Sequence, residues 1–250
     1  MSPGAGIEER LAAVRERIER AATRAGRSGE GITLVGVSKG QSAQAVIRAV
    51  RAGLSDVGEN YLQEASLKIQ KVEVELEGVR SPAPRWHFIG RLQRNKVRDV
   101  VRHFDAVETV DRESLGAELE RRADQAGRRL RVLLQVNLSD EPQKGGVAPE
   151  QLEGLLAAST SWSRLKVAGL MTVPAAQADP EHSRPAFARL RDLRDQLREA
   201  PGGAGLHELS MGMTADFEVA IEEGATIVRV GSGIFGPRPD RPPTPGAAES

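Results

Sequence analysis

The chain has 250 residues, of which 39% are apolar and only 3% aromatic, so aliphatic side chains must build its core. Lys plus Arg and Asp plus Glu both number 35, and this zero net charge argues against a protein held to nucleic acid or membrane by bulk charge. The absence of cysteine excludes disulfides, cysteine-ligated zinc, iron–sulfur clusters and thiol catalysis.

The two ends of the chain have the composition of tails. Residues 1–6 and the proline-rich residues 237–250 are predicted to be disordered, with a single domain over residues 7–236. The first residues lack the basic-then-apolar order of a signal peptide, and no apolar run approaches the ~20 residues of a membrane helix. We therefore expect a cytoplasmic protein without membrane contact.

Helical and strand-like patterns alternate between these tails. Apolar residues at helical spacing from Ile7 to Ala22 predict a helix ahead of the first strand. Eight short strands are predicted within residues 32–38, 54–58, 86–90, 105–110, 131–137, 166–172, 207–211 and 226–231. Eight βα units in about 230 residues indicate an α/β protein, a (β/α)8 TIM-type barrel with an extra N-terminal helix. The competing doubly wound sheet usually has about five or six strands.

Lys39 directly follows the first predicted strand. In a (β/α)8 barrel the carboxyl ends of the strands face the functional site. Burial there disfavours the ammonium form, and a neutral amine is a nucleophile toward aldehydes, with which it forms Schiff bases. Two other interpretations stay open: the side chain reaches solvent from the strand end, or it pairs with Glu59.

The segment VRVGSGIFG ends the eighth strand, and its Gly231, Gly233 and Gly236 match G-x-G-x-x-G. Too few residues follow for the second strand and acidic residue of a dinucleotide fold. A phosphate site remains, in which Gly231 and Ser232 offer backbone N–H groups and a hydroxyl after strand eight. The alternative is a tight turn that needs glycines for positive φ.

Two polar residues of the last two strands are also candidates. The seventh strand ends at Ser210, beside the predicted phosphate loop, and leads to a helix for which Thr214 is the expected N-cap. Arg229 lies within the eighth strand, where an arginine must point into the site or pair with an acid. Against a ring nitrogen, its guanidinium would donate a hydrogen bond and keep that nitrogen unprotonated.

The remaining polar patterns predict no metal or nucleic-acid site. The four histidines lack metal-ligand spacing, so we expect them to be structural or on the surface, with no bound metal. The basic stretch from Arg91 to Arg102 carries no interleaved aromatics, which favours a solvated helix face over binding to nucleic acid.

Seven motifs in order between residues 34 and 236 carry a family resemblance. They are VSKG, VGENYLQE, WHFIGRLQRNK, NLSDEPQKGGV, GLMTVP, LSMGMTADFEVAI and VRVGSGIFG. In these motifs the chain resembles the pyridoxal phosphate homeostasis protein family, single-domain barrels similar to the N-terminal domain of alanine racemase.

The resemblance implies a cofactor, pyridoxal 5′-phosphate (PLP), held by Lys39 as a Schiff base. It implies that the phosphate is bound by Ser210, Gly212, Gly231 and Ser232. It further implies that Arg229 faces the pyridine nitrogen, and that Asn60 and Met211 line the ring site. An arginine at that nitrogen weakens the ring as an electron sink, which suits restrained chemistry.

The function implied by the resemblance is intracellular PLP homeostasis: delivery of the cofactor to apo-enzymes through transient contact, without robust catalysis. We expect a monomer, because the predicted surface helices carry many charges and leave no evident apolar stripe. The alternative is a PLP-dependent, racemase-like enzyme. No catalytic residue is assigned beyond Lys39, because no clear second acid/base is present and Tyr61 is the one tyrosine.

Two departures from the family pattern concern lysines. Many members have a further lysine shortly after the first, whereas here Lys39 is followed by Gly40, Gln41 and Ser42. The family's S-K-S-G turn is Gln143-Lys144-Gly145-Gly146 in this chain. Lys144 is then the one nearby lysine that could assist cofactor transfer.

Overall fold

A computed structural model describes residues 6–78, 83–139, 145–175 and 177–237. The strands are β1 (Thr33–Val37), β2 (Asp56–Glu59), β3 (Arg85–Phe88), β4 (Ala106–Val110), β5 (Leu130–Gln135), β6 (Leu165–Met171), β7 (Glu208–Ser210) and β8 (Ile227–Val230). The α-helices are α1 (Ile7–Arg24), α2 (Ala43–Arg51), α3 (Leu62–Leu76), α4 (Val97–His103), α5 (Glu113–Gln125), α6 (Leu152–Ala158), α7 (Arg184–Leu197), α8 (Phe217–Glu222) and α9 (Ser232–Phe235). Short 3₁₀ helices span Gly29–Gly31, Arg94–Lys96, Pro149–Gln151, Ser159–Ser161, Pro180–Ser183 and Gly203–Gly205.

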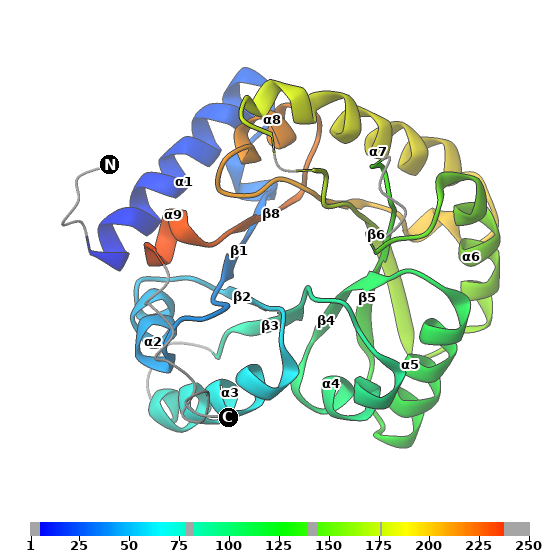
Figure 1. The fold of residues 1–250 in the computed structure, drawn as a ribbon, viewed down its shortest axis with the longest axis horizontal. Coiled ribbons are helices and arrows are strands. Elements are labelled where there is room, and N and C mark those ends of the chain that lie inside the picture. The colour runs from blue at the N-terminus through cyan, green and yellow to red at the C-terminus, as the bar shows by residue number, and fades with distance from the viewer. Residues whose placement is uncertain (1–5, 79–82, 140–144, 176, 238–250) are drawn as a thin grey trace, which may run out of the picture.

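The strands close into a parallel barrel in chain order, with β8 pairing back to β1 (Figure 1). All eight predicted strands and the (β/α)8 TIM-type architecture are confirmed. Val35 of β1 pairs with Asp56 of β2 on one side and with Arg229 of β8 on the other. This register places the carboxylate of Asp56 and the guanidinium of Arg229 on either side of the same strand. Of the two predicted tails, only Gly6 and Pro237 fall within the described residues.

The predicted extra helix is α1, which packs against α8 and α9 (Figure 1). Its buried residues, Ile7, Leu11, Val14, Ile18, Ala21 and Ala22, form one face at helical spacing. Arg10 Nε donates to the Ile234 carbonyl at 2.8 Å, and Arg17 Nε donates to Glu218 at 2.6 Å. The first helix therefore covers the elements that flank the last strand, beside the closure of the barrel.

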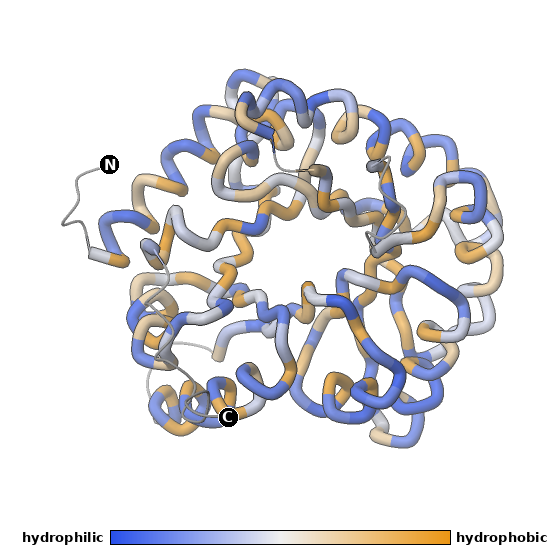
Figure 2. The backbone as a smooth tube through the Cα atoms, in the orientation of Figure 1, coloured by the Kyte–Doolittle hydropathy of each residue, from blue (hydrophilic) through white to orange (hydrophobic). Residues whose placement is uncertain are grey.

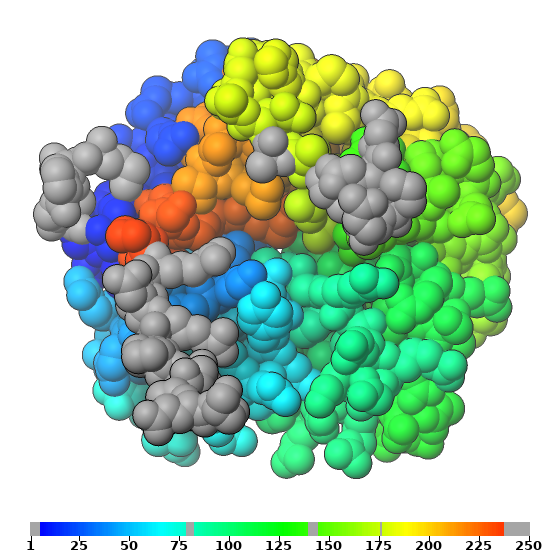
Figure 3. All heavy atoms as spheres, viewed as in Figure 1, coloured from blue at the N-terminus to red at the C-terminus, as the bar shows by residue number. Residues whose placement is uncertain are grey.

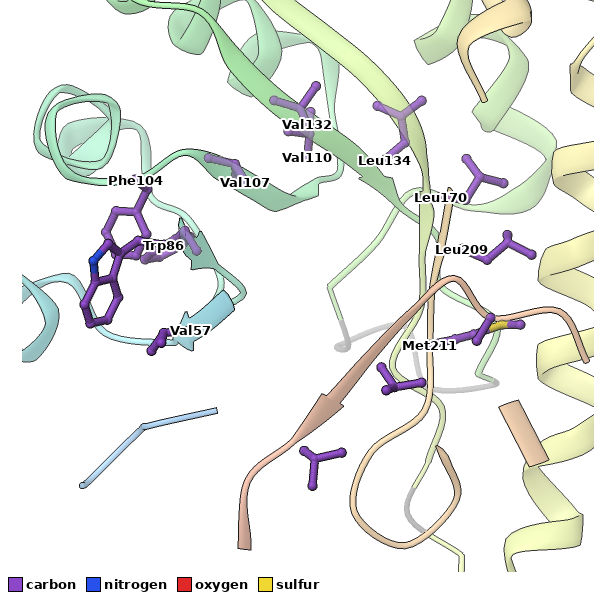
Figure 4. Close-up of a cluster of buried hydrophobic side chains, with 14 of the residues drawn as sticks. Val57, Trp86, Phe104, Val107, Val110, Val132, Leu134, Leu170, Leu209 and Met211 are labelled. Atoms are coloured by element: carbon purple, nitrogen blue, oxygen red, sulfur yellow. The ribbon is translucent and has the colours of Figure 1, made fainter. Parts of the chain in front are cut away.

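The main apolar core lies between the strands and the surrounding helices (Figure 4). The outward-facing side chains Val57, Trp86 and Leu209 belong to it, and Phe104 stands edge-on to Phe88 with ring centroids 5.3 Å apart. Figure 2 shows hydrophilic residues interspersed with hydrophobic ones along the surrounding helices. None of the helices in the described part of the chain is long and apolar enough to cross a bilayer.

The inside of the barrel is divided between apolar and charged residues. Parallel strands covered on both faces are usually near-continuous apolar runs. Here one interior cluster is apolar, made by Val35, Leu133, Ala168, Met171 and Ile227. Asp56, His87, Glu108 and Arg229 are also buried. Hydrogen bonds join the first three, and the Ser210 hydroxyl joins Glu108 to Arg229. Buried charges must be paired, so the arrangement of these groups decides the chemistry of the barrel.

Candidate functional site

A cavity of about 400 Å³ opens where the strands β1, β2 and β8 end, a size typical of small-molecule sites. Its lining comes from segments far apart in the chain: Val37, Lys39, Gln41, Asn60, Ile89, Val173, Met213, Thr214, Ala215, Arg229, Gly231, Ser232 and Gly236. Figure 3 shows the hollow near the centre of one face of the molecule. Lys39 and Arg229 are the ionisable side chains among these lining residues.

Lys39 is half-buried and lines the cavity two residues after β1 ends. Its ammonium nitrogen lies 4.7 Å from the centroid of the Tyr61 ring, which suits a cation–π contact. The alternative in which Lys39 pairs with Glu59 is wrong, because Glu59 hydrogen-bonds to Lys68 of α3 at 2.5 Å. The Lys39 amine is thus left on the cavity wall without a carboxylate partner among the described residues.

The residues on both sides of Lys39 are fixed by a buried cluster. Lys68 Nζ donates to the Ser38 carbonyl at 2.6 Å, and the Ser38 hydroxyl donates to Glu59 Oε1 at 2.5 Å. On the other side, Gly40 N–H donates to Glu64 Oε1 at 2.7 Å, and Lys68 also donates to that oxygen. One buried ammonium therefore holds the chain before and after Lys39.

Within this cluster, the burial of the Glu59 carboxylate is the least favourable contribution. Burial raises the pKa of its carboxyl above the usual value, although the ammonium of Lys68 opposes the shift. Among the described atoms, its Oε2 is buried and has no hydrogen-bond partner. Such a carboxylate tolerates burial only while its cation is present.

Arg229 is buried to 3% exposure at the cavity floor, and its guanidinium is held from two sides. Nη1 donates to Ser210 Oγ at 2.5 Å, and Nη2 donates to the Thr172 carbonyl at 2.8 Å. Ser210 Oγ in turn donates to Glu108 Oε2 at 2.5 Å. Both expectations for Arg229 therefore hold together: it lines the site, and it faces an acid, 3.9 Å away.

Glu108 continues into a charged series across the barrel. Its Oε1 lies 2.7 Å from His87 Nδ1, and His87 Nε2 lies 2.9 Å from Asp56 Oδ1. Asp56 accepts two hydrogen bonds from Arg85, each 2.8 Å long. Burial alone lowers the pKa of His87, but the hydrogen bonds to Asp56 and Glu108 outweigh it and raise the pKa to about 9. His87 is therefore an imidazolium between two carboxylates at neutral pH.

We expect the free energy of unfolding to fall as pH rises from 6.5 to 9. The pKa of His87 is raised from 6.5 to about 9 in the folded protein, so its contribution is complete below pH 6.5 and is lost as pH rises to 9. The loss amounts to about 3 kcal/mol. Urea denaturation at pH 6, 7.5 and 9 measures it, and His87→Gln is expected to remove this pH dependence while His182→Gln, at an exposed site, keeps it. If the free energy of unfolding depended on pH equally in the wild type and in both variants, the pH dependence would not come from His87.

The glycine segment after β8 forms a turn and the short helix α9. Gly231 has φ −103° and lines the cavity, so it does not need the left-handed region, whereas Gly236 has φ +81°. The positive-φ interpretation thus applies to Gly236 but not to Gly231. Gly231 N–H donates to Thr214 Oγ1 at 3.2 Å, which joins the loops after β7 and β8.

The expectation that Thr214 caps the helix after β7 is wrong. The helix begins at Phe217 with Asp216 as its N-cap, and Asp216 Oδ1 accepts from Met213 N–H at 2.7 Å. Thr214 instead lines the cavity beside Gly231. Thr214 and Met213 could have been selected from the sequence, because both lie in the loop that follows a predicted strand.

Five of the eight residues predicted for the site line this cavity: Lys39, Asn60, Arg229, Gly231 and Ser232. The other three are not among the residues that line it. Ser210 is fully buried beneath Arg229, Met211 lies in the outer core (Figure 4), and Gly212 occupies a turn with φ +89°. Their direct contact with a ligand stays a prediction. Lys144 lies outside the described residues.

Comparison with known proteins gives consistent matches over most of the chain. Residues 10–239 match the family described as alanine racemase, N-terminal domain. The pyridoxal phosphate homeostasis protein of Aquifex aeolicus is 43% identical over 231 residues, 92% of this chain and 97% of that protein. The protein of the same name from Pseudomonas aeruginosa is 44% identical over 232 residues, 93% of this chain and 96% of its own length.

The solved structures agree with these relatives. PipY of Synechococcus elongatus, determined with PLP bound, superimposes with a TM-score of 0.79 at 35% identity, covering 92% of this chain and all of PipY (100%). Alanine racemase of Corynebacterium glutamicum, at 17% identity, has a TM-score of 0.59 over 95% of this chain and 63% of the enzyme. The likeness to the racemase shows a shared barrel fold.

Proposed function

Because this chain belongs to the alanine racemase N-terminal domain family, and within it to the pyridoxal phosphate homeostasis proteins, we propose that it binds PLP through Lys39 and supplies it to apo-enzymes. The observation that carries the proposal is the cavity lining: Lys39 and Arg229 are its ionisable side chains, and no aspartate, glutamate, histidine or tyrosine lines it among the described residues. Such a site can hold an aldehyde but has no second group for proton transfer.

The donors around the cavity fit the chemistry of PLP. The Lys39 amine suits an aldehyde carbon, and the hydroxyls of Thr214 and Ser232 suit a phosphate. Arg229 has N–H groups beyond the two that Ser210 and Thr172 accept, and these suit a ring nitrogen. Val37, Ile89 and Val173 add apolar wall, and Asn60 lies at the edge. Bound PLP supplies an aldehyde that amines capture reversibly and a ring that accepts electrons.

The residues of the site restrain this chemistry rather than complete it. Arg229 can only donate hydrogen bonds, so a ring nitrogen facing it stays unprotonated and withdraws electrons weakly. Tyr61, the one tyrosine of the chain, is 56% exposed; its ring contacts the Lys39 ammonium from a neighbouring groove and is not among the residues that line the cavity. We therefore favour a carrier over the racemase-like alternative, whose second acid/base is not among the lining residues.

The surface next to the cavity supports delivery by contact. A groove of about 1180 Å³ shares Asn60 with the cavity and runs along the loops after β2, β3 and β4. Arg91, Arg94 and Lys96 line it, and none of these three pairs with a carboxylate among the described residues. We propose that the acidic rim of an apo-enzyme docks here during transfer, which assigns the basic stretch a protein partner rather than nucleic acid.

We expect Arg91→Gln/Arg94→Gln to slow PLP transfer to an apo-aminotransferase about tenfold at low salt, because charge complementarity mainly sets association rates. The regain of aminotransferase activity after mixing with the PLP-loaded protein measures the rate. The matched control is Arg98→Gln/Arg102→Gln, which removes two charges from a separate hollow between α4 and α5.

Two results would contradict the delivery proposal. A transfer rate that is independent of acceptor concentration and equal in all variants would mean simple release of free PLP. The racemase-like enzyme would be favoured if the protein exchanged the α-hydrogen of alanine with solvent deuterium faster than free PLP does, and if Lys39→Ala lost this exchange.

The monomeric state is part of the same proposal. The exposed large apolar side chains among the described residues are few: Tyr61, Leu67, Val74 and Val173. Leu67 and Val74 lie on one face of α3, two turns apart. Single exposed apolar residues are normal on monomer surfaces. A cytoplasmic location stays a prediction of the sequence.

A further inference from the structure

The buried charges inside the barrel form one hydrogen-bonded series that ends at the cavity. We propose that Glu108 and His87 are positioning residues which, through Ser210, fix the orientation of the Arg229 guanidinium at the cavity floor. Neither Glu108 nor His87 lines the cavity, so they act on a bound ring only through Arg229. The inference rests on the proposed PLP-binding function and adds to it the groups that set the state of its ring-facing arginine.

The direction of the two hydrogen bonds at Ser210 is determined by chemistry. The Arg229 guanidinium has no acceptor atom, so Ser210 Oγ must accept from it at 2.5 Å. The hydroxyl hydrogen of Ser210 is then free to go to Glu108 Oε2, which is also 2.5 Å away. Glu108 therefore accepts at this oxygen, as an ionised carboxylate does. Ser210 therefore accepts from Arg229 and donates to Glu108, and the reverse arrangement is not possible.

The other oxygen of Glu108 fixes the state of His87. Against the effect of burial, the hydrogen bonds to His87 help to hold the pKa of the Glu108 and Asp56 carboxyls below their usual values, so both are ionised at neutral pH. As acceptors 2.7 and 2.9 Å from the imidazole, they place a hydrogen on each ring nitrogen of His87. Signs then alternate from Arg85 through Asp56, His87 and Glu108 to Arg229. Removal of the negative charge at Glu108 would leave two buried cations, Arg229 and His87, without the anion between them.

Other charged groups that face the series do not replace this anion. Arg131 of β5 interacts electrostatically with Glu108 and Asp56, but its side chain hydrogen-bonds to Glu208 at 2.7 Å. Asp216 acts on Arg229 only electrostatically, because its oxygens accept from Ser183 and from Met213 N–H. Glu108 is thus the carboxylate that reaches Arg229 through a hydrogen-bonded link.

Stability alone gives no reason for such a series. Buried ion pairs are often no more stable than apolar packing of the same volume, and apolar packing is what Val35, Leu133 and Ile227 provide elsewhere inside the barrel. A series in which every group is hydrogen-bonded fixes the orientation of the side chain at its end. The last member here is the guanidinium that the proposed function places at the ring nitrogen.

The test compares Glu108→Gln with Glu208→Gln in the full-length protein. Both replace a carboxylate that pairs with a basic side chain of another strand, but Glu208 is half-buried, pairs with Arg131 and has no hydrogen-bonded link to Arg229. A glutamine at position 108 has one acceptor oxygen where glutamate has two, so it cannot accept from both His87 and Ser210, and the series is interrupted at one of these two residues. We expect Glu108→Gln to raise the Kd for PLP about tenfold and to make the visible band of the complex shift between pH 6 and 8, whereas Glu208→Gln keeps the wild-type band.

Ser210→Ala breaks the same link without changing charge, so it carries the test where Glu108→Gln does not fold. We expect it to weaken binding of PLP and of pyridoxal, which has no phosphate, by the same factor. Weakened binding of PLP alone would instead indicate direct phosphate contact by Ser210 and would overturn the inference. So would identical bands and Kd values for Glu108→Gln and Glu208→Gln. A wild-type protein that acquires no band with PLP would refute the proposed function itself.

Discussion

Lys39→Ala is expected to abolish covalent attachment of PLP completely. Lys39 carries the amine that lines the cavity, and no second lysine lines it among the described residues. Wild-type protein loaded with PLP and reduced with borohydride should carry the label on the peptide containing residue 39, as detected by mass spectrometry. The variant should show neither the label nor the visible absorption band.

Lys71→Ala is the matched control, because Lys71 is an exposed lysine of α3 and should leave label and band unchanged. Label on another residue of Lys39→Ala at the wild-type yield would overturn the assignment of Lys39. Lys144 is the residue to inspect in that case, since it is the second lysine that the family resemblance suggests. A colourless wild-type protein in the presence of PLP would remove the cofactor proposal altogether.

Lys68→Met is expected to lower the free energy of unfolding by about 3–5 kcal/mol, the usual cost of leaving a buried charge without its partner. Lys68 is 4% exposed, and its ammonium contacts Glu59, Glu64 and the Ser38 carbonyl. Without it, Glu59 must stay buried as an unpaired carboxylate or take up a proton. Urea denaturation at pH 7 measures the loss.

Lys71, which lies on the same helix as Lys68, provides the control for this prediction. Lys71→Met alters an exposed lysine and should change stability by less than about 0.5 kcal/mol. The double variant Glu59→Gln/Lys68→Met should be more stable than Lys68→Met alone, because the unpaired charge is gone. Because the cluster holds Ser38 and Gly40, Lys68→Met should also weaken PLP binding. Equal stability of the two single methionine variants would contradict the account.

The order of strands and helices could be predicted from the sequence because it depends on local patterns. The apolar residues Leu11, Val14 and Ile18 recur at the period of a helix, and the β-branched run before Lys39 has the length and composition of a buried strand. Knowing where a strand ends is enough to place Lys39, Gly231 and Ser232 at one end of the barrel, and the structure shows all three on one cavity.

The partners of the buried polar groups could not be predicted in this way. Glu59 was a candidate partner of Lys39, but its side chain points out of the barrel to Lys68, because it has opposite parity to the inward-facing Asp56 and Gly58 along β2. The sequence places Ser210 beside the phosphate loop, but it does not show that the Ser210 hydroxyl hydrogen-bonds to Arg229 and Glu108. A strand of three residues, β7, gives too little pattern to decide which face a side chain takes.

By itself the sequence determined the barrel, the end of it that carries the site, and the lysine amine of that site. Each of these depends on local patterns, namely the alternation of strands and helices along the chain and the residue at which each strand ends. Only the tertiary structure decided that Asp56, His87, Glu108 and Arg229 meet inside the barrel. They come from four strands, and their meeting depends on how the strands are staggered when the sheet closes, β8 against β1. That stagger is a property of the whole closed sheet, and no local pattern in the chain encodes it.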